Sequence, residues 1–483
     1  MLYVTIVGAV AFFIFIAHHP LHNHGFRMPW INSQDQVHHG RWFSVYIFKA
    51  INNADMPVLT PLIAVIVNTL TAFTLLKIWN FKLSGLQTFL VGVLFVAYPA
   101  FLAPFYYTWS TLIFIVSGFF AVLAVYSLSK IGVLRFFISI ALIVMAMATY
   151  QPAISFFCVA SVAAAIAHVM DRNKTIVETY KIFSFRVFSA VIGTLAYFVS
   201  MKLSGAKSHA TEYNDLSELP VRVFTVIKKS FAQLYLSQPD FSESLKYLLL
   251  AVCISALVFG LMSVRRNMWK ILSFLGLFFA LVVSAKAMYF LSSNNQFYEY
   301  RYNTATVVIY CFAAALIFHY LSGRALQNLF LILISFIALR FVQVDLIRQE
   351  ILFRGQQHDM AVANRLLQRM ESLPGLDASK TYDLVKIGKY SSNFRSKILR
   401  SNGKRWDIAG DVHLDNAEIS ASWTDEDIFI LLGSKIKFKY RHYDPDFIQK
   451  KEDIRKNHLE GRAPWPSPDS VFIQDDKIVL YLQ

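Results

Sequence analysis

Long apolar runs, each closed by a short polar loop, follow one another from residue 1 to about residue 345. A helix that spans the hydrocarbon core of a bilayer needs about 20 mostly apolar residues, with about 17 as a lower limit. The first run has neither a basic start nor an A-x-A cleavage site, so we expect an uncleaved helix rather than a signal peptide. The pattern predicts eleven spanning helices, near residues 1–17, 57–77, 84–103, 108–128, 132–149, 152–169, 184–202, 245–263, 270–290, 303–321 and 325–343.

The pattern changes after residue 345. Residues 359–372 repeat apolar positions at helical spacing. Strand-like alternation follows at residues 381–388, 426–432, 434–440 and 477–482. Charged residues number 35 in the first 345 positions and 42 in the last 138. We therefore expect a mainly α, polytopic membrane domain over residues 1–345 and a small soluble α/β domain over residues 346–483.

Basic residues gather in alternate loops. The loops at 98–108 and 149–152 contain no Lys or Arg, and the loop at 291–302 contains only Arg301. Because cytoplasmic loops are enriched in Lys and Arg, this alternation predicts a cytoplasmic N-terminus and, after eleven crossings, a periplasmic tail. Loops 18–56 and 203–244 would share the outer face with the tail. The basic set assigned to the cytoplasm is Lys77, Lys82, Lys130, Arg135, Arg172, Lys174, Lys181, Arg186, Arg265, Arg266, Lys270 and Arg324.

Composition removes several classes of function. The net charge of +15 does not indicate nucleic-acid binding, since basic loops are expected of any multispanning protein. Cys158, Cys253 and Cys311 all fall inside apolar runs, which favours packing over disulfides or metal ligation. The sequence has no Walker A motif, no G-x-G-x-x-G before a helix and no C-x-x-C, so neither nucleotide nor redox chemistry has support.

Carboxylates are scarce in the membrane part, which holds only 11 of the 31 acidic residues. A carboxylate near a bilayer is costly, so each one indicates a function or a loop. Asp35 lies in loop 18–56, ahead of a stretch, Arg41–Ile51, whose aromatic residues predict a helix lying in the membrane interface. Such a helix would hold Asp35 near the headgroups, where it could deprotonate a sugar hydroxyl as a general base. The alternative is a solvated loop carboxylate.

Positive charge on the predicted outer face is a second candidate feature. Arg301 precedes a spanning helix and could bind a lipid phosphate through a bidentate pair of hydrogen bonds. Lys286 and Arg340, near the outer ends of their helices, could add charge to the same pocket. Each could instead be a snorkelling residue. Tyr298 and Glu299 are candidate substrate-binding residues in the same loop, although Glu299 could simply pair with Arg301.

The first outer loop is also rich in histidine. No H-x-x-x-H on a helix and no carboxylate-rich set accompanies these residues, so hydrogen bonding to headgroups or sugars is favoured over a metal site. We expect no cofactor, although a divalent metal stays open. The candidate substrate-binding residues of this loop are His38, His39, Arg41 and Trp42. The histidines are His18, His19, His22, His24, His38 and His39.

Several short stretches stand in a recognisable order along most of the chain. They are Asp35 followed by Gly40-Arg41-Trp42-Phe43, then Tyr98-Pro99, Thr149-Tyr150-Gln151, Arg301 with Asn303, and the closing 464–471 stretch, PWPSPDSV. In this layout the chain resembles the serotype-converting O-antigen glucosyltransferases of bacteria and phages. This Gtr group consists of integral-membrane enzymes of the GT-C class.

The resemblance implies an activity and its partners. It implies inverting transfer of a sugar, usually glucose, from a polyprenyl-phosphate donor to O-antigen or another glycan. The reaction would take place on the periplasmic face of the bacterial inner membrane. The resemblance also implies that an early outer-loop carboxylate, here Asp35, acts as the base. Many members of the GT-C class have two adjacent acids in this loop, whereas this chain has Gln34 before Asp35. That departure leaves a second carboxylate and metal dependence open.

Two other classes of function stay in view. A lipid-linked glycan flippase or transporter would show charged or broken helices at the membrane midplane and often internal repeats. The apolar runs show few such charges and no repeat. A structural or assembly protein would use the tail as a binding module, and substitution of Asp35 would then have no effect.

The loop alternation gives a testable topology. Reporter fusions after Lys82, Arg135, Lys174, Arg266 and Arg324 should report the cytoplasm, because the positive-inside rule holds their loops there. A fusion at the C-terminus should report the periplasm. A cytoplasmic C-terminus would overturn the assignment of every loop.

Overall fold

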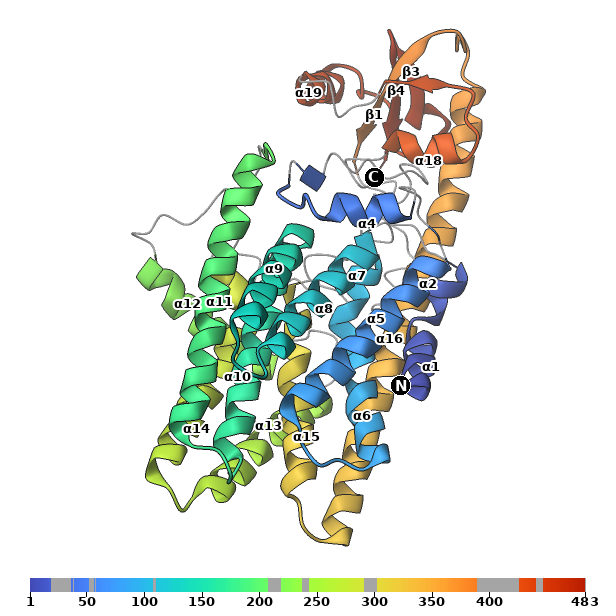
Figure 1. The fold of residues 1–483 in the computed structure, drawn as a ribbon. Coiled ribbons are helices and arrows are strands. Elements are labelled where there is room, and N and C mark those ends of the chain that lie inside the picture. Colours follow the sequence, from blue (N-terminus) through green and yellow to red (C-terminus); the bar gives the residue numbers. More distant parts are fainter. Residues whose placement is uncertain are drawn as a thin grey trace. The chain divides into compact units, whose positions relative to one another are not determined.

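The computed structural model describes residues 1–18, 36–37, 39–51, 56, 58–106, 110–206, 219–236, 243–290, 302–388, 425–439 and 446–482. These residues are mainly helical (Figure 1). The chain divides into two compact units, and the division falls between Ile347 and Arg348, inside helix α16 (Arg324–Glu371).

The first unit is built from helices. They are α1 (Leu2–Ala11), α2 (Phe13–His18), α4 (Ser44–Ala50), α5 (Leu59–Trp79), α6 (Gly85–Val96), α7 (Leu102–Tyr106), α8 (Thr111–Ser127), α9 (Val133–Thr149), α10 (Ile154–Met170), α11 (Ile176–Leu203), α12 (Leu219–Leu236), α13 (Glu243–Val264), α14 (Met268–Ser284), α15 (Val307–Tyr320) and the first part of α16. Four short 3-10 turns join them, namely η2 (Pro99–Phe101), η4 (Gln151–Ala153), η7 (Ala287–Phe290) and η9 (Thr304–Thr306).

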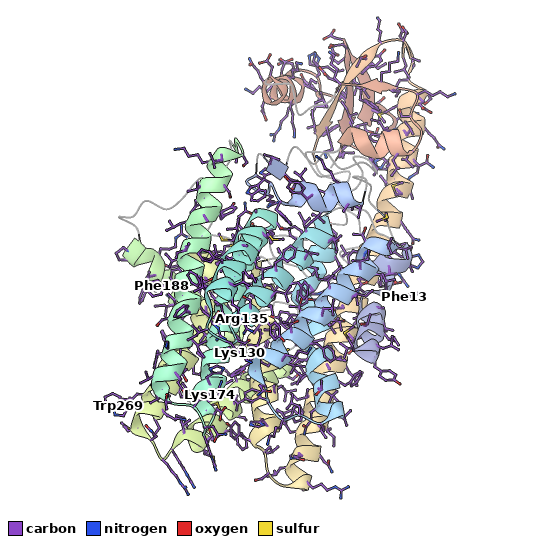
Figure 2. All side chains as sticks on the ribbon, in the orientation of Figure 1. Phe13, Lys130, Arg135, Lys174, Phe188 and Trp269 are labelled. Carbon is purple, nitrogen blue, oxygen red and sulfur yellow. The ribbon has the colours of Figure 1, made fainter. Side chains whose placement is uncertain are left out.

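The length and apolar composition of its helices identify the first unit as the membrane part of the protein. Among the described residues, six helical stretches are long and apolar enough to cross a bilayer, and five shorter apolar helices accompany them. Every predicted span overlaps one of these helices, although the count of eleven crossings stays a prediction. Apolar side chains also cover the flanks, where Phe13 is 55% and Phe188 62% exposed (Figure 2). Such exposed surface is expected where lipid, rather than water, is the solvent.

Sequence signals explain how the helices begin. Ser84 and Thr175 each open a capping box with the Gln or Glu three residues later, starting α6 and α11. At the opposite end of the unit, Pro99 and Pro152 open the 3-10 turns that lead into α7 and α10. Proline suits the first turn of a helix because it lacks the amide hydrogen that would have no acceptor there.

The structure corrects three details of the membrane part. Arg186, assigned to a cytoplasmic loop, lies inside α11 and is only 1% exposed. The interfacial helix begins at Ser44, with Arg41 in the turn before it. The buried face of that helix, which includes Phe48, packs on protein, namely the start of α8 and turn η4 (Figure 1). The last span and the helix predicted at residues 359–372 are parts of the single helix α16.

The second unit holds a mixed four-stranded sheet. Its elements are the end of α16, β1 (Thr381–Ile387), α18 (Asp425–Leu431), β2 (Lys437–Phe438), α19 (Phe447–Asn457), η12 (Pro468–Ser470), β3 (Val471–Gln474) and β4 (Lys477–Tyr481). The strand order is β2-β1-β4-β3, with β1 parallel to both neighbours and β3 antiparallel to β4. The alternation of β1 sends Leu384 toward α16 and α18, and Val385 toward α19. Both faces of the sheet are therefore covered.

One prediction for this unit was wrong, and helix α19 and strand β3 were not predicted. Residues 426–432 fall in helix α18 rather than in a strand, because consecutive residues Ile428 and Phe429 both enter the core.

Asp383, on β1, is nearly buried and accepts a hydrogen bond from Lys450 of α19 at 3.2 Å. At the edge of the sheet, a hydrogen bond from Lys439 lowers the pKa of Asp476 below its usual value.

Candidate functional site

The segment that follows Asp35 is attached to the ends of two helices. Asp35 itself lies outside the described residues, but its neighbours from Gln36 onward, except His38, are described. The Phe43 amide donates to the carbonyl of Ala148 in α9 at 3.0 Å. The Trp42 indole donates to the Ser200 hydroxyl of α11 at 3.1 Å. The residues that come after the proposed base are thus held against the helical unit.

A glycine allows this close approach. Gly40 has φ +71°, a left-handed conformation that side chains disfavour. The Tyr197 hydroxyl donates to the Gly40 carbonyl at 3.3 Å. A Cβ atom at Gly40 would lie 2.8 Å from the sulfur of Met201 and 2.9 Å from the Tyr197 oxygen. Any larger residue would therefore push the segment away from α11.

Arg41 is the centre of a polar group at this end of the unit. Its guanidinium donates to the side-chain oxygens of Gln36 and Gln151, each at 3.4 Å. The same guanidinium lies 5.1 Å from the centre of the Tyr150 ring, a cation–π arrangement. The Gln151 amide in turn donates to the His39 carbonyl at 2.7 Å. Arg41 therefore links the segment that follows Asp35 to turn η4.

Lys286 supplies a second cation at the same end. It follows α14 and is 2% exposed, and its ammonium has no hydrogen-bond partner among the described residues. The nitrogen lies 5.8 Å from the centre of the Tyr289 ring. The Met288 amide donates to the Ser155 hydroxyl at 3.1 Å, which fixes turn η7 to the start of α10. A buried cation that lacks an anion is costly, and a bound anion would offset that cost.

One aromatic residue connects the two cations. Tyr302 packs against the cluster of Phe48, Phe114 and Tyr150, and also against the cluster that contains Tyr289. Its ring meets that of Tyr289 edge to face at 6.2 Å. Turns η4 and η7 are also in contact. Arg41 and Lys286 therefore border one aromatic region at one end of the helices, and Tyr302 directly follows Arg301 in sequence.

Among the described residues, Arg340 is not joined to this group. Arg340 bonds to Gln343 on its own helix, and no contact among the described residues joins it to Lys286. A shared phosphate pocket for Lys286 and Arg340 therefore stays a prediction. The residues of the predicted site that lie outside the described part of the chain are Asp35, His38, Tyr298, Glu299 and Arg301.

Sequence reasoning missed two buried polar residues of the first unit, Asn68 and Asp345. A small cavity beside Tyr150 and Thr304 is also lined by Asn68 of α5, whose buried amide nitrogen has no partner among the described residues. Asp345, on α16, has no exposed surface. A single polar residue inside an apolar run was the available signal for both. Across the described ranges, no three His, Cys, Asp or Glu side chains gather closely enough to hold a metal ion.

Apolar helices around a polar, aromatic region at their ends define a polytopic membrane protein with a candidate site at one membrane face. The sequence model of the family described as Glucosyl transferase GtrII matches residues 12–318, well over half of the chain. The chain belongs to this family, so it is a glucosyltransferase that acts in glycan modification. Neither the curated proteins nor the solved structures contain a match to this chain.

Gly40→Ala tests whether the outer segment needs its contact with α11. The substitution should lower the melting temperature and speed hydrogen exchange at the amides of residues 40–43. The left-handed backbone costs an alanine about 1–2 kcal/mol, and the new methyl also meets Met201 and Tyr197. Gly205→Ala is the matched control, because Gly205 has φ +74° with nothing within 4 Å. Equal effects in both variants would show that backbone strain alone matters.

Proposed function

We propose that the protein transfers a sugar from a polyprenyl-phosphate donor to O-antigen or a related surface glycan. In keeping with the family, the proposed sugar is glucose. The reaction is placed on the periplasmic face of the inner membrane, and it inverts the anomeric centre. The observation that carries the proposal is the pair of cations, Arg41 and Lys286, at the same end of the helices as the segment that follows Asp35.

A lipid-linked donor suits this arrangement. Nucleotide sugars are not available outside the cytoplasm, so a donor on that face must arrive within the bilayer. Its phosphate would stand at headgroup depth, where positive charge is needed. The buried ammonium of Lys286 lies at a helix end rather than in the middle of a span. We assign it, with Arg301, to the donor phosphate.

The chemistry follows from the charges. The acceptor hydroxyl attacks the anomeric carbon of the donor while its proton passes to the Asp35 carboxylate. The new carbon–oxygen bond forms as the bond from that carbon to the phosphate oxygen breaks, and polyprenyl phosphate leaves. Cations at the phosphate stabilise the charge that develops on the leaving group. Attack opposite the leaving group inverts the anomeric centre.

Family membership favours the transferase over the alternatives. A glycan transporter also fits one observation, since Arg186 is buried inside α11 and intramembrane charges often mark transport paths. A transporter would move an unchanged lipid-linked sugar between leaflets and form no new glycosidic bond. Product analysis with purified protein therefore separates the two. An assembly protein would show neither activity.

Asp35→Asn should abolish most transfer while leaving membrane insertion and donor binding intact. Asparagine keeps the size and hydrogen bonding of the side chain but cannot accept the proton. General-base catalysis contributes about 10²–10⁴-fold. The measurement is transfer from a lipid-linked sugar by purified protein, with Asp55→Asn from the same loop as the control. Turnover of Asp35→Asn within a few-fold of the parent would make Asp35 a solvated residue. The base would then be sought at Glu299, Asp215 or Asp345.

Substitution of the basic residues should weaken donor binding. Lys286→Met removes a buried charge and should leave the fold at least as stable. It should nevertheless raise the KM for the donor by about tenfold or more, because the donor loses one hydrogen bond to a charged group. Arg301→Lys should lose the bidentate fork and part of the activity, and Arg301→Ala should lose more. Lys202→Met, at the exposed end of α11, is the control. Unchanged donor affinity in Lys286→Met or Arg301→Ala would remove that residue from the site.

A further inference from the structure

A groove runs between α10, α11 and α14, away from the polar region just described. It encloses about 440 Å³, within the roughly 300–1,000 Å³ of typical small-molecule pockets. Its walls are almost entirely apolar. Representative wall residues are Phe157 and Val162 from α10, Val187 and Val191 from α11, and Phe279 and Ala287 from the α14–η7 segment.

The groove opens sideways into the region that lipid would occupy. Val187, Val191 and Phe279 at its lips are 46%, 52% and 49% exposed. Val187 and Val191 belong to α11, which is apolar and long enough to cross a bilayer, and Phe279 belongs to the shorter apolar helix α14. A hydrocarbon chain could therefore pass from the bilayer into the groove without crossing a polar barrier.

Turn η7 separates the groove from the candidate site. Ala287 and Phe290 line the groove, whereas Tyr289, from the same turn, packs in the aromatic region beside the ammonium of Lys286. On α11 the lining residues run from Phe183 to Val191, about 12 Å at 1.5 Å per residue. One end of the groove thus lies next to Lys286, a buried cation without a hydrogen-bond partner among the described residues. The wall between the two ends is apolar.

A polar pair lies in the wall of the groove away from η7. The Arg186 guanidinium donates to the Ser161 carbonyl at 3.4 Å, and both residues line the groove. Ser161 stands near the middle of α10, so this pair lies about halfway along the helix. A charged group at this depth is a barrier that an apolar chain does not pass.

We propose that this groove binds the first isoprene units of the lipid-phosphate donor, with the phosphate at the η7 end near Lys286. The inference rests on the proposed function and adds the position of the lipid chain. Two features favour a lipid that carries a phosphate, and the proposed reaction makes that lipid the donor. The groove is continuous with the turn that carries Lys286, and its apolar length begins where the phosphate would be neutralised. The chain length of the donor should then matter to binding, and not to the chemical step.

The test compares two donors that carry the same sugar, one on a long polyprenyl phosphate and one on ethyl phosphate, which has no isoprene unit to enter the groove. Ala190→Phe and Ala280→Phe each fill the groove from one wall. Each should raise the KM for the long donor about tenfold or more, as expected when two or more methylenes lose burial. The kcat and the KM for the short donor should stay within about twofold. Ala251→Phe, on the exposed side of α13, is the matched control.

A second measurement keeps this inference separate from the proposed function. Long polyprenyl phosphate without a sugar, carrying a photoreactive group in its first isoprene units, should label peptides of α11 and α14 in the full-length protein. Labelling without any transfer would retain the groove and reject the proposed function. Transfer with no labelling there, or equal KM changes in Ala190→Phe and Ala251→Phe, would reject the groove. Labelling that excess phospholipid competes away as well as excess polyprenyl phosphate would assign the groove to bulk lipid and also reject the proposal.

Discussion

The backbone must satisfy its own hydrogen bonds wherever lipid surrounds it, and the remaining features of the first unit depend on this constraint. Long helices meet it along their length, so irregular backbone is confined to their ends. Four 3-10 turns, η2, η4, η7 and η9, join or follow apolar helices in this way. Polar side chains that need varied partners therefore gather beside such turns, as Arg41 does with Gln151.

Contacts with aromatic rings lower the free-energy cost of placing Arg41 and Lys286 at the ends of the helices. The Arg41 guanidinium and the Lys286 ammonium each face a tyrosine ring, a contact that offsets part of the cost of desolvation without neutralising the charge. A carboxylate partner would stabilise Lys286 more strongly, but it would also cancel the charge that a phosphate needs. A cation held on an aromatic face keeps its affinity for an incoming anion.

The sequence predicted the helices well because hydrophobic length is a local property. Each of the eleven apolar runs overlaps an apolar helix, and the strand at residues 381–388 agrees with β1 to within one residue. Prediction from the sequence failed where tertiary packing, rather than a local pattern, determined the position of a residue. Arg186 looks like a loop residue beside Lys181, yet α11 extends through both and buries only Arg186. The ring that connects Arg41 to Lys286 is Tyr302, far from both in sequence, so no local pattern could have shown that the two cations border one region.

The two faces of η7 explain why this end of the unit suits an amphiphile. Because residues along a 3-10 turn project to different sides, Ala287 and Phe290 border hydrocarbon space while Tyr289 lies beside Lys286. A ligand that uses both faces must carry an apolar chain and an anion joined at one point, as a lipid phosphate does. A free sugar phosphate would leave the groove unused, and a neutral lipid would leave Lys286 without an anion. Only the joined molecule satisfies both at once, and this is the physical reason for proposing a lipid-linked donor.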